Sequence, residues 1–466
     1  MKYKKKKNVR VQKKENQHHH GLLGTALLLS AAAGMIYEVV ATHILLFYFV
    51  RSSYSIALVL SIFLAGLGIG SYLVYRFKTK NDALLFGTAQ FLLGCIGFVI
   101  LLQIESFVHA LSTFGLFLTT IVVLLPTAIL LGAAFPLAVH IFEKKQRRVV
   151  GFVYAVDLVG AVLGTLLAGF FLIPVLGNTV SLIIAASINV VAGMLLFKNL
   201  WVKVVAVLFV CLAIVFFLPQ KSDVDFRQQS AFGEVVVYDG RLYIDSREQC
   251  SLSYLPSTGE RLIVNYTMRT LPRSAKTINI GLGCGLTAKE LLSQLDAPID
   301  IVEINPAVVA ADKELSRVLG DPRINLILDE GLSYLRKNKQ TYDAVIMDIE
   351  EPAVVHSSDL YTSEAFLTIR ESLKDNGVFG VWINPCTSDE YYDIMYNTLH
   401  TVFPYVAKPG DDFFIASIYD LGLVPYSKRT SEQRINTLDR KLLSSIYFEQ
   451  CKWWPDNRSD HIMKFN

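Results

Sequence analysis

Long hydrophobic stretches fill the first half of the chain, whereas the second half alternates short apolar runs with polar segments. A bilayer core about 30 Å thick requires roughly 20 apolar residues per helix. Stretches of this length predict seven membrane-spanning helices, at 21–50, 54–76, 83–104, 114–141, 151–173, 178–197 and 201–218. The loops between them are short, so neighbouring helices are expected to pack antiparallel.

Three polar residues interrupt these stretches: Glu38 and His43 in the first predicted span and Asp157 in the fifth. Charged groups inside a bilayer are costly and normally face the interior of a helix bundle. Two interpretations stay open, namely a path for a substrate or a proton, and hydrogen bonds between helices. Small residues four apart, such as Gly160 and Gly164, indicate close packing of helices rather than chemistry.

The second half reads as an α/β region. Alternation over 230–255, with turn signals at 238–240 and 257–259, predicts a small antiparallel sheet. Apolar strands are then expected at 276–281, 299–304, 323–328, 342–348 and 377–383, separated by helical segments. This order is typical of a parallel, Rossmann-like sheet with helices on both faces. The expected domains are a basic disordered tail (1–20), a transmembrane domain (21–220), a β-sheet subdomain (221–272) and a Rossmann-like domain (273–466).

A glycine-rich turn follows the first of these strands. Gly281, Gly283 and Gly285 permit a tight turn and a close approach of the backbone to a ligand at the start of a helix. Glu303 ends the next strand about 20 residues later, where a carboxylate can accept both hydroxyls of a ribose. The alternative is that three ordinary strand ends carry solvated carboxylates. The glycine turn together with acidic residues at successive strand ends favours a nucleoside site.

Further acidic residues follow the next two strands. Asp329 and Glu330 stand after the third strand, where a carboxylate can accept from the amino group of adenine. Asp348 ends the fourth strand and should point into the crevice beyond the sheet, with Glu350 and Glu351 close by. A free ammonium has a pKa near 10, so an attacking amine needs a carboxylate base. A sulfonium cofactor would supply the electrophilic carbon.

These residues resemble the spermidine synthase (polyamine aminopropyltransferase) family, in the bacterial form that is fused to a membrane domain. The resemblance covers roughly 230–420, and the segments 29–39 and 63–72 are also similar to the fused membrane region. It implies that Asp348 deprotonates the amine, and that Gln249 and Glu351 line the amine pocket. Tyr266 is a further candidate for substrate binding. The co-substrate is expected to be decarboxylated S-adenosylmethionine or S-adenosylmethionine, without a metal.

The chain departs from the family pattern at two places. Cys284 replaces the aspartate that is expected to hold the amine of the decarboxylated cofactor, and the Tyr-His-Glu segment is missing between Gln249 and Pro272. Gly-Cys-Gly is common in S-adenosylmethionine-dependent methyltransferases, which gives an alternative function. A polyamine transporter or sensor with a nucleoside-binding domain is a third hypothesis. Expected partners are a small amine and the lipid bilayer; a homodimer is an option.

Charge and composition bear on the location. The chain is 52% hydrophobic, with a net charge of +3 and a mean hydropathy of +0.41. Its basic tail precedes a hydrophobic span, which indicates a cytoplasmic topology signal rather than nucleic-acid binding. The first span is too long for a signal-peptide core and predicts a retained anchor. Seven crossings would leave the C-terminal domain outside the cell, whereas supply of the cofactor favours the cytoplasm, so the sequence leaves the side open.

Six cysteines occur, at 95, 211, 250, 284, 386 and 451. None forms a CxxC pair, and two lie in apolar spans, so the sequence predicts neither a disulfide framework nor a zinc site. Unpaired cysteines favour a cytosolic domain.

Overall fold

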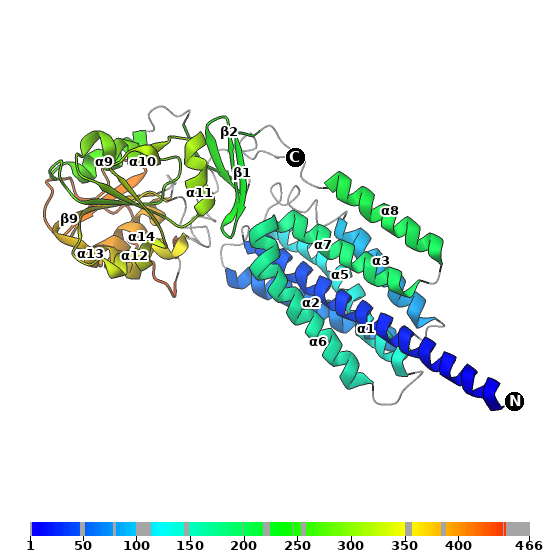
Figure 1. Ribbon diagram of the computed structural model, residues 1–466. Coiled ribbons are helices and arrows are strands. Elements are labelled where there is room, and N and C mark those ends of the chain that lie inside the picture. The colour runs from blue at the N-terminus through cyan, green and yellow to red at the C-terminus, as the bar shows by residue number, and fades with distance from the viewer. Residues whose placement is uncertain are drawn as a thin grey trace. The chain divides into compact units, whose positions relative to one another are not determined.

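A computed structural model of the chain describes residues 2–46, 52–77, 81–98, 113–143, 149–197, 199–217, 224–245, 247–252, 258–349, 357–383, 388–440 and 442–443. The chain divides into two compact units, Met1–Gln220 and Lys221–Asn466. The first unit is helical and the second is an α/β unit (Figure 1). Each unit is described here by itself.

Helices make up the N-terminal unit. They are α1 (Lys2–Leu46), α2 (Ser52–Arg76), α3 (Asp82–Ile96), α5 (Thr113–Glu143), α6 (Val150–Leu167), the π-helical η2 (Ala168–Leu172), α7 (Ile173–Leu196) and α8 (Leu200–Phe217). Within the described ranges, four segments are long and apolar enough to cross a membrane: Gly21–Leu45, Ser55–Arg76, Phe117–Phe142 and Val150–Leu196. The last contains a break at Gly177, which has φ 77° and ψ 174°, and so holds two helices in succession. Seven crossings stay a prediction.

Helix α1 begins at Lys2, so the basic segment continues directly into the first hydrophobic stretch. Lysine, arginine, glutamine and glutamate are good helix formers, and the first glycine of the chain is Gly21. The domain boundaries expected from the sequence, with a separate tail over 1–20, stay a prediction.

Close contacts at glycines show the relative directions of the helices. A Cβ at Gly160 or Gly164 of α6 would overlap the backbone carbonyl of Leu28 or Ala32 of α1, respectively. The later glycine of α6 faces the later residue of α1, so α1 and α6 run in the same direction. In the same way, α2 and α5 run in the same direction, since Gly66 faces Ala128 and Gly70 faces the backbone of 129–133.

Helix α7 runs against two of its neighbours. Gly87 of α3 faces Gly193 of α7, whereas Gly94, later in α3, faces Val190, which comes earlier in α7. The two helices therefore run in opposite directions. Near the end of α1, His43 Nδ1 lies 3.1 Å from Oδ1 of Asn178, close to the start of α7. The contacts at the glycines therefore make α1 and α6 parallel, α2 and α5 parallel, and α3 and α7 antiparallel, which is compatible with the alternating directions that the sequence predicts.

The α1–α6 contact gives a matched pair of substitutions. We expect Gly164→Ala to lower the free energy of unfolding by about 1–3 kcal/mol, because the added methyl group meets the backbone at Ala32. Gly169→Ala is the control, since nothing lies within 4 Å of a Cβ there. The measurement is thermal unfolding of the full chain in detergent. Equal melting temperatures for the two variants would contradict the packing described here.

Two sheets form the C-terminal unit. Strands β1 (Phe226–Ser230), β2 (Gly233–Tyr238), β3 (Arg241–Ile244) and β4 (Arg247–Ser251) make an antiparallel sheet in that order. The second sheet has the order β10-β11-β9-β8-β5-β6-β7. Its strands are β5 (Thr277–Ile280), β6 (Ile299–Glu303), β7 (Ile324–Leu328), β8 (Tyr342–Met347), β9 (Leu373–Trp382), β10 (Tyr405–Ala407) and β11 (Phe413–Ser417). Strands β5 to β9 are parallel and β11 is antiparallel to β9. The predicted Rossmann-like fold of the S-adenosylmethionine-dependent transferase type is confirmed, together with the small antiparallel sheet.

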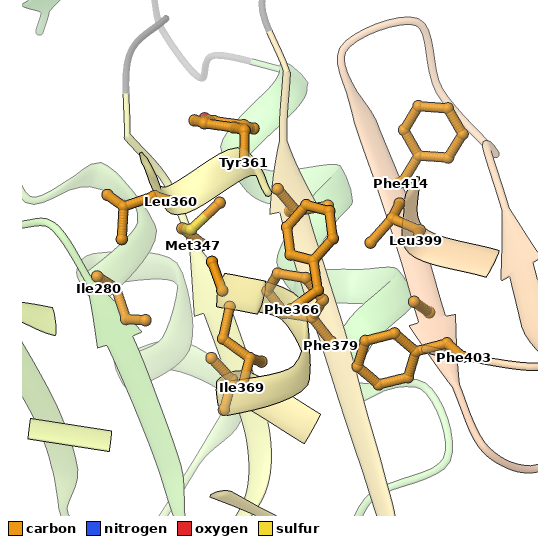
Figure 2. Close-up of a cluster of buried hydrophobic side chains, with 14 of the residues drawn as sticks. Ile280, Met347, Leu360, Tyr361, Phe366, Ile369, Phe379, Leu399, Phe403 and Phe414 are labelled. Carbon is orange, nitrogen blue, oxygen red and sulfur yellow. The ribbon is translucent and has the colours of Figure 1, made fainter. Parts of the chain in front are cut away.

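Helices cover both faces of the seven-stranded sheet (Figure 1). They are α9 (Thr258–Met268), α10 (Leu286–Gln294), α11 (Pro306–Ala311), α12 (Gly331–Lys337), α13 (Ser363–Ser372) and α14 (Asp389–His400), with short 3₁₀ segments at Asp312–Glu314, Val318–Gly320 and Ser358–Tyr361. On the face of α12, α13 and α14, the core contains Phe366, Phe379 and Phe403 (Figure 2). Strand β8 supplies Met347 to this core, which fixes the position of the residue that follows, Asp348.

The small sheet shares its core with the other face. Val235, Val237 and Leu242 belong to the same buried cluster as α9, α10 and α11. The turn expected at 257–259 is wrong, because α9 begins at Thr258 and packs on β9 and β11. A boundary at residue 272 would therefore separate α9 from the sheet that it covers.

Candidate active site

The glycine turn lies between β5 and α10, as the sequence predicts. Gly281, Gly283 and Gly285 have φ values of 95°, 50° and 77°, a region that side chains with a Cβ rarely adopt. A Cβ at Gly281 would lie 2.7 Å from the carbonyl oxygen of Asp348. The absence of a side chain therefore lets the end of β8 approach the turn.

Glu303 connects the end of β6 to this turn. Its carboxylate accepts hydrogen bonds from the backbone N–H of Leu282 (2.9 Å) and of Asn305 (2.8 Å). The residue is only 8% exposed, and burial raises the pKa of its carboxyl group. The structure thus brings the predicted ribose-binding carboxylate to the glycine turn.

The two acidic residues after β7, Asp329 and Glu330, have different partners. Glu330 caps α12, because its carboxylate accepts from the backbone N–H of Leu332 (2.9 Å) and Ser333 (2.7 Å). Asp329 keeps a partly exposed carboxylate, 3.4 Å from Nζ of Lys337. The other oxygen of Asp329 accepts from the backbone N–H of Glu330 (2.8 Å), so both carboxylates of the pair already have partners within the chain.

Asp348 is half-buried at the end of β8. It accepts a hydrogen bond from the hydroxyl of Thr287, in the first turn of α10. Burial raises the pKa of Asp348, and the negative charge of Asp412 raises it further, against the effect of the Thr287 bond. A carboxyl group with a raised pKa is a suitable acceptor for a proton from an amine.

Two other carboxylates, Glu260 and Asp412, belong to the surroundings of Asp348. Burial raises the pKa of Glu260 to about 7, and Asp348 and then Asp412 contribute to that increase. Burial also raises the pKa of Asp412, while Lys408 opposes the increase. Neither residue is predicted from the sequence, because Glu260 follows an expected turn and Asp412 belongs to no motif.

Of the three remaining predicted residues, two are described and one lies outside the described ranges. Gln249 is half-buried on β4, next to Cys250. Tyr266 packs in the core, with its ring centroid 5.8 Å from that of Phe413, so the structure gives it a packing role. Glu351 lies outside the described residues.

The prediction that the cysteines are unpaired is wrong. Cys250 of β4 and Cys284 of the glycine turn form a disulfide, with their Cα atoms 5.9 Å apart. The two residues are 34 positions apart in the chain, so spacing alone could not reveal the pair. Cys95 and Cys211 are free. No group of three or more His, Cys, Asp or Glu side chains among the residues that the structure covers could hold a metal ion.

Comparison with known proteins identifies the domain. The family described as "Spermine/spermidine synthase domain" matches residues 258–432. The C-terminal unit carries a spermine/spermidine synthase domain. This segment begins at α9 and contains the glycine turn, Glu303, Asp348 and Asp412, whereas the small sheet precedes it.

Curated proteins that are similar to the chain are named polyamine aminopropyltransferases, which are transferases. It is 27% identical over 401 residues to a polyamine aminopropyltransferase of Corynebacterium efficiens, covering 76% of each chain. It is 25% identical over 354 residues to polyamine aminopropyltransferase 2 of Aquifex aeolicus, covering 69% of this chain and 71% of the relative. The C-terminal unit is just over half of the chain, so the first alignment also includes part of the N-terminal unit.

Among solved structures, the chain is similar to a spermidine synthase from Thermotoga maritima. The TM-score is 0.37 at 20% identity, and the match covers 47% of this chain and 83% of that chain.

The raised pKa of Glu260 predicts how stability depends on pH. The folded protein keeps this proton up to about pH 7, whereas an unperturbed glutamate releases it near 4.5. Folding therefore binds a proton in this window, and stability falls as pH rises from about 4.5 to about 7. We expect the melting temperature to fall over this range, and to fall less in Glu260→Gln.

Glu314 is exposed, so Glu314→Gln is the control for this pH scan. Its melting temperature should depend on pH as that of the unaltered protein does. If the melting temperature depended on pH in the same way in all three proteins, Glu260 would not be protonated in the folded state over this range.

Proposed function

We propose that the protein is a membrane-anchored aminopropyltransferase that moves an aminopropyl group from decarboxylated S-adenosylmethionine to an amine such as putrescine. The observation that carries this proposal is the carboxylate of Asp348 beside the glycine turn, inside the spermidine synthase domain. The reaction requires a place for the nucleoside, which the glycine turn would supply. It also requires an acceptor for the proton of the amine, which the carboxylate would supply.

On the nucleoside side, the roles follow from the backbone geometry. The three glycines expose backbone to a ligand, and Glu303 stands at the strand end next to them. Each oxygen of Glu303 accepts one backbone hydrogen bond and can accept another from a ribose hydroxyl. We assign the acidic pair Asp329 and Glu330, after β7, to the amino group of adenine.

On the amine side, Asp348 is the general base. An ammonium group with a pKa near 10 must lose a proton before its nitrogen can attack carbon. In the proposed step, a C–N bond forms as the C–S bond breaks, the electron pair stays on sulfur, and Asp348 takes the proton. A thioether nucleoside leaves.

Glu260 and Asp412 define the class of acceptor. Together with Asp348 they provide three carboxyl groups from α9, β8 and the segment before β11. Such a group favours a substrate with more than one positive charge, such as a diamine, because each ammonium can neutralise a carboxylate. Gln249 is proposed to line the same pocket.

Two other functions are weighed against this proposal. A methyltransferase would use intact S-adenosylmethionine, and calorimetry with the intact and the decarboxylated compound separates the two donors. A transporter would use the polar residues of the helical unit. There, His43 pairs with Asn178, and the α1–α6 register puts Glu38 about 13 residues, or roughly 20 Å, along the helix from Asp157. This geometry favours hydrogen bonds between helices over a shared path.

We expect Asp348→Asn to lower kcat by about 10²- to 10⁴-fold, because the base is lost. Binding of the donor should change little, since the glycine turn and Glu303 are untouched. Product analysis with putrescine and the decarboxylated donor measures the first quantity, and calorimetry measures the second. Asp375→Asn, at an exposed position of β9, is the control. Full activity in Asp348→Asn would remove this mechanism.

We also propose that Met1–Gln220 is a multipass membrane domain and that Lys221–Asn466 lies on the side opposite the basic tail. The parallel pairs α1–α6 and α2–α5 and the antiparallel pair α3–α7 are compatible with seven alternating crossings, of which α8 would be the last. The Cys250–Cys284 pair adds support, because disulfides persist in oxidising compartments.

Alkaline phosphatase is active only outside the cytoplasm and can test this side. We expect activity when it is fused after Asn466, and none when it is fused after Glu143, at the end of α5. Activity in the second fusion, or inactivity in the first, would contradict seven alternating crossings.

A further inference from the structure

The disulfide joins two parts of the candidate site that are distant in sequence. Cys284 stands between Gly283 and Gly285 in the turn assigned to the nucleoside, and Cys250 follows Gln249, which is assigned to the amine. A Cβ at Gly283 would lie 3.7 Å from Sγ of Cys250, so the strand lies directly against the turn. The covalent bond therefore links the two substrate sides of the site.

The turn needs external restraint. Three residues with positive φ are all glycines, which have the largest conformational freedom in the unrestrained chain. Within the turn, the backbone N–H of Gly285 donates to the carbonyl of Leu282 (2.8 Å), and Glu303 accepts from Leu282. The disulfide adds a covalent restraint to these hydrogen bonds.

Strand β4 needs the same restraint. It stands at the edge of the four-stranded sheet and pairs with β3 through an irregular register at Leu242 and Tyr243. An edge strand has hydrogen-bonded neighbours on one side only. The bond to Cys284 therefore fixes where Gln249 stands relative to the glycine turn.

We propose that the Cys250–Cys284 disulfide is a redox-sensitive latch that keeps the nucleoside turn and the amine-side strand in their binding arrangement. A dithiol reductant supplies the two electrons that break the S–S bond; each cysteine gains a proton, and the reductant becomes a cyclic disulfide. In the reduced protein the turn is free to leave its binding conformation, so affinity for the S-adenosyl donor falls. The assignment of the ligand rests on the proposed function.

The two sulfur atoms differ in access. Cys284 is 2% exposed, whereas Cys250 is half-buried. Thiol–disulfide exchange starts with attack by a thiolate on an accessible sulfur. The incoming thiolate therefore attacks Sγ of Cys250 and releases Cys284 as the leaving thiolate.

Calorimetry with the full chain in detergent tests the latch. The probe is 5′-methylthioadenosine, the thioether nucleoside that the proposed reaction releases. We expect dithiothreitol to weaken its affinity by ~10-fold, within the range of ordinary coupling between sites. Reoxidation with oxidised glutathione should restore the affinity. An affinity that changes less than twofold on reduction overturns the proposal.

Alkylation provides an independent measurement. Mass spectrometry after alkylation of the non-reduced protein in native membranes should find Cys250 and Cys284 unmodified, and both should be modified after reduction. Alkylation of both residues without reduction overturns the proposal.

Variants supply the matched controls. Cys250→Ser and Cys284→Ser should bind the nucleoside as weakly as the reduced protein and should no longer respond to dithiothreitol. Cys211→Ser removes a free, exposed cysteine of α8 and should keep the full response. If the serine variants do not fold, reduction and reoxidation of the unaltered protein still decide.

The outcomes separate the latch from the proposed function. Redox-dependent nucleoside binding without aminopropyl transfer would keep the latch and remove the transferase activity. Transfer that is equally fast in oxidised and reduced protein would keep the activity and remove the latch.

Discussion

The site depends on a close approach between the backbones at the ends of β5 and β8. Gly281 follows β5, and the carbonyl of Asp348 occupies the space that a side chain at Gly281 would need. The parallel pairing of β5 with β6 and β8 brings the three strand ends to one edge of the sheet. Glu303 then ties the end of β6 to the same turn through Leu282. A larger residue at Gly281 would push the glycine turn away from Asp348.

The carboxyl groups around this edge are individually unfavourable. Burial raises the pKa of Asp348, Glu260 and Asp412, and the charge of a neighbouring carboxylate adds to the increase at Asp348 and Glu260. Charge on a buried carboxylate costs free energy unless a partner compensates for it. In the proposed function, a cationic amine would be such a partner, and the raised pKa would let Asp348 accept its proton.

The sequence predicted the parts of this site that depend on short-range patterns. The strand–glycine turn–helix pattern located Gly281, Gly283 and Gly285, and strand ends located Glu303 and Asp348. Contacts between distant segments were not predictable in this way. Glu260 was missed because the start of α9 reads as a turn, although its apolar residues cover the sheet. Glu330 was assigned to adenine, but as the residue before α12 it is also the natural cap of that helix.

The cysteines show how one tertiary contact changes the interpretation of a whole chain. Considered one at a time, Cys250 and Cys284 indicated a reducing environment. Because the two cysteines are paired, they no longer indicate a reducing environment, and a disulfide is typical of an oxidising compartment. The proposed placement of the C-terminal unit opposite the basic tail would agree with this indication. An S-adenosyl donor made in the cytosol would then have to reach a site across the membrane, so in that arrangement the helical unit would bear on how the donor reaches the site as well as on anchoring.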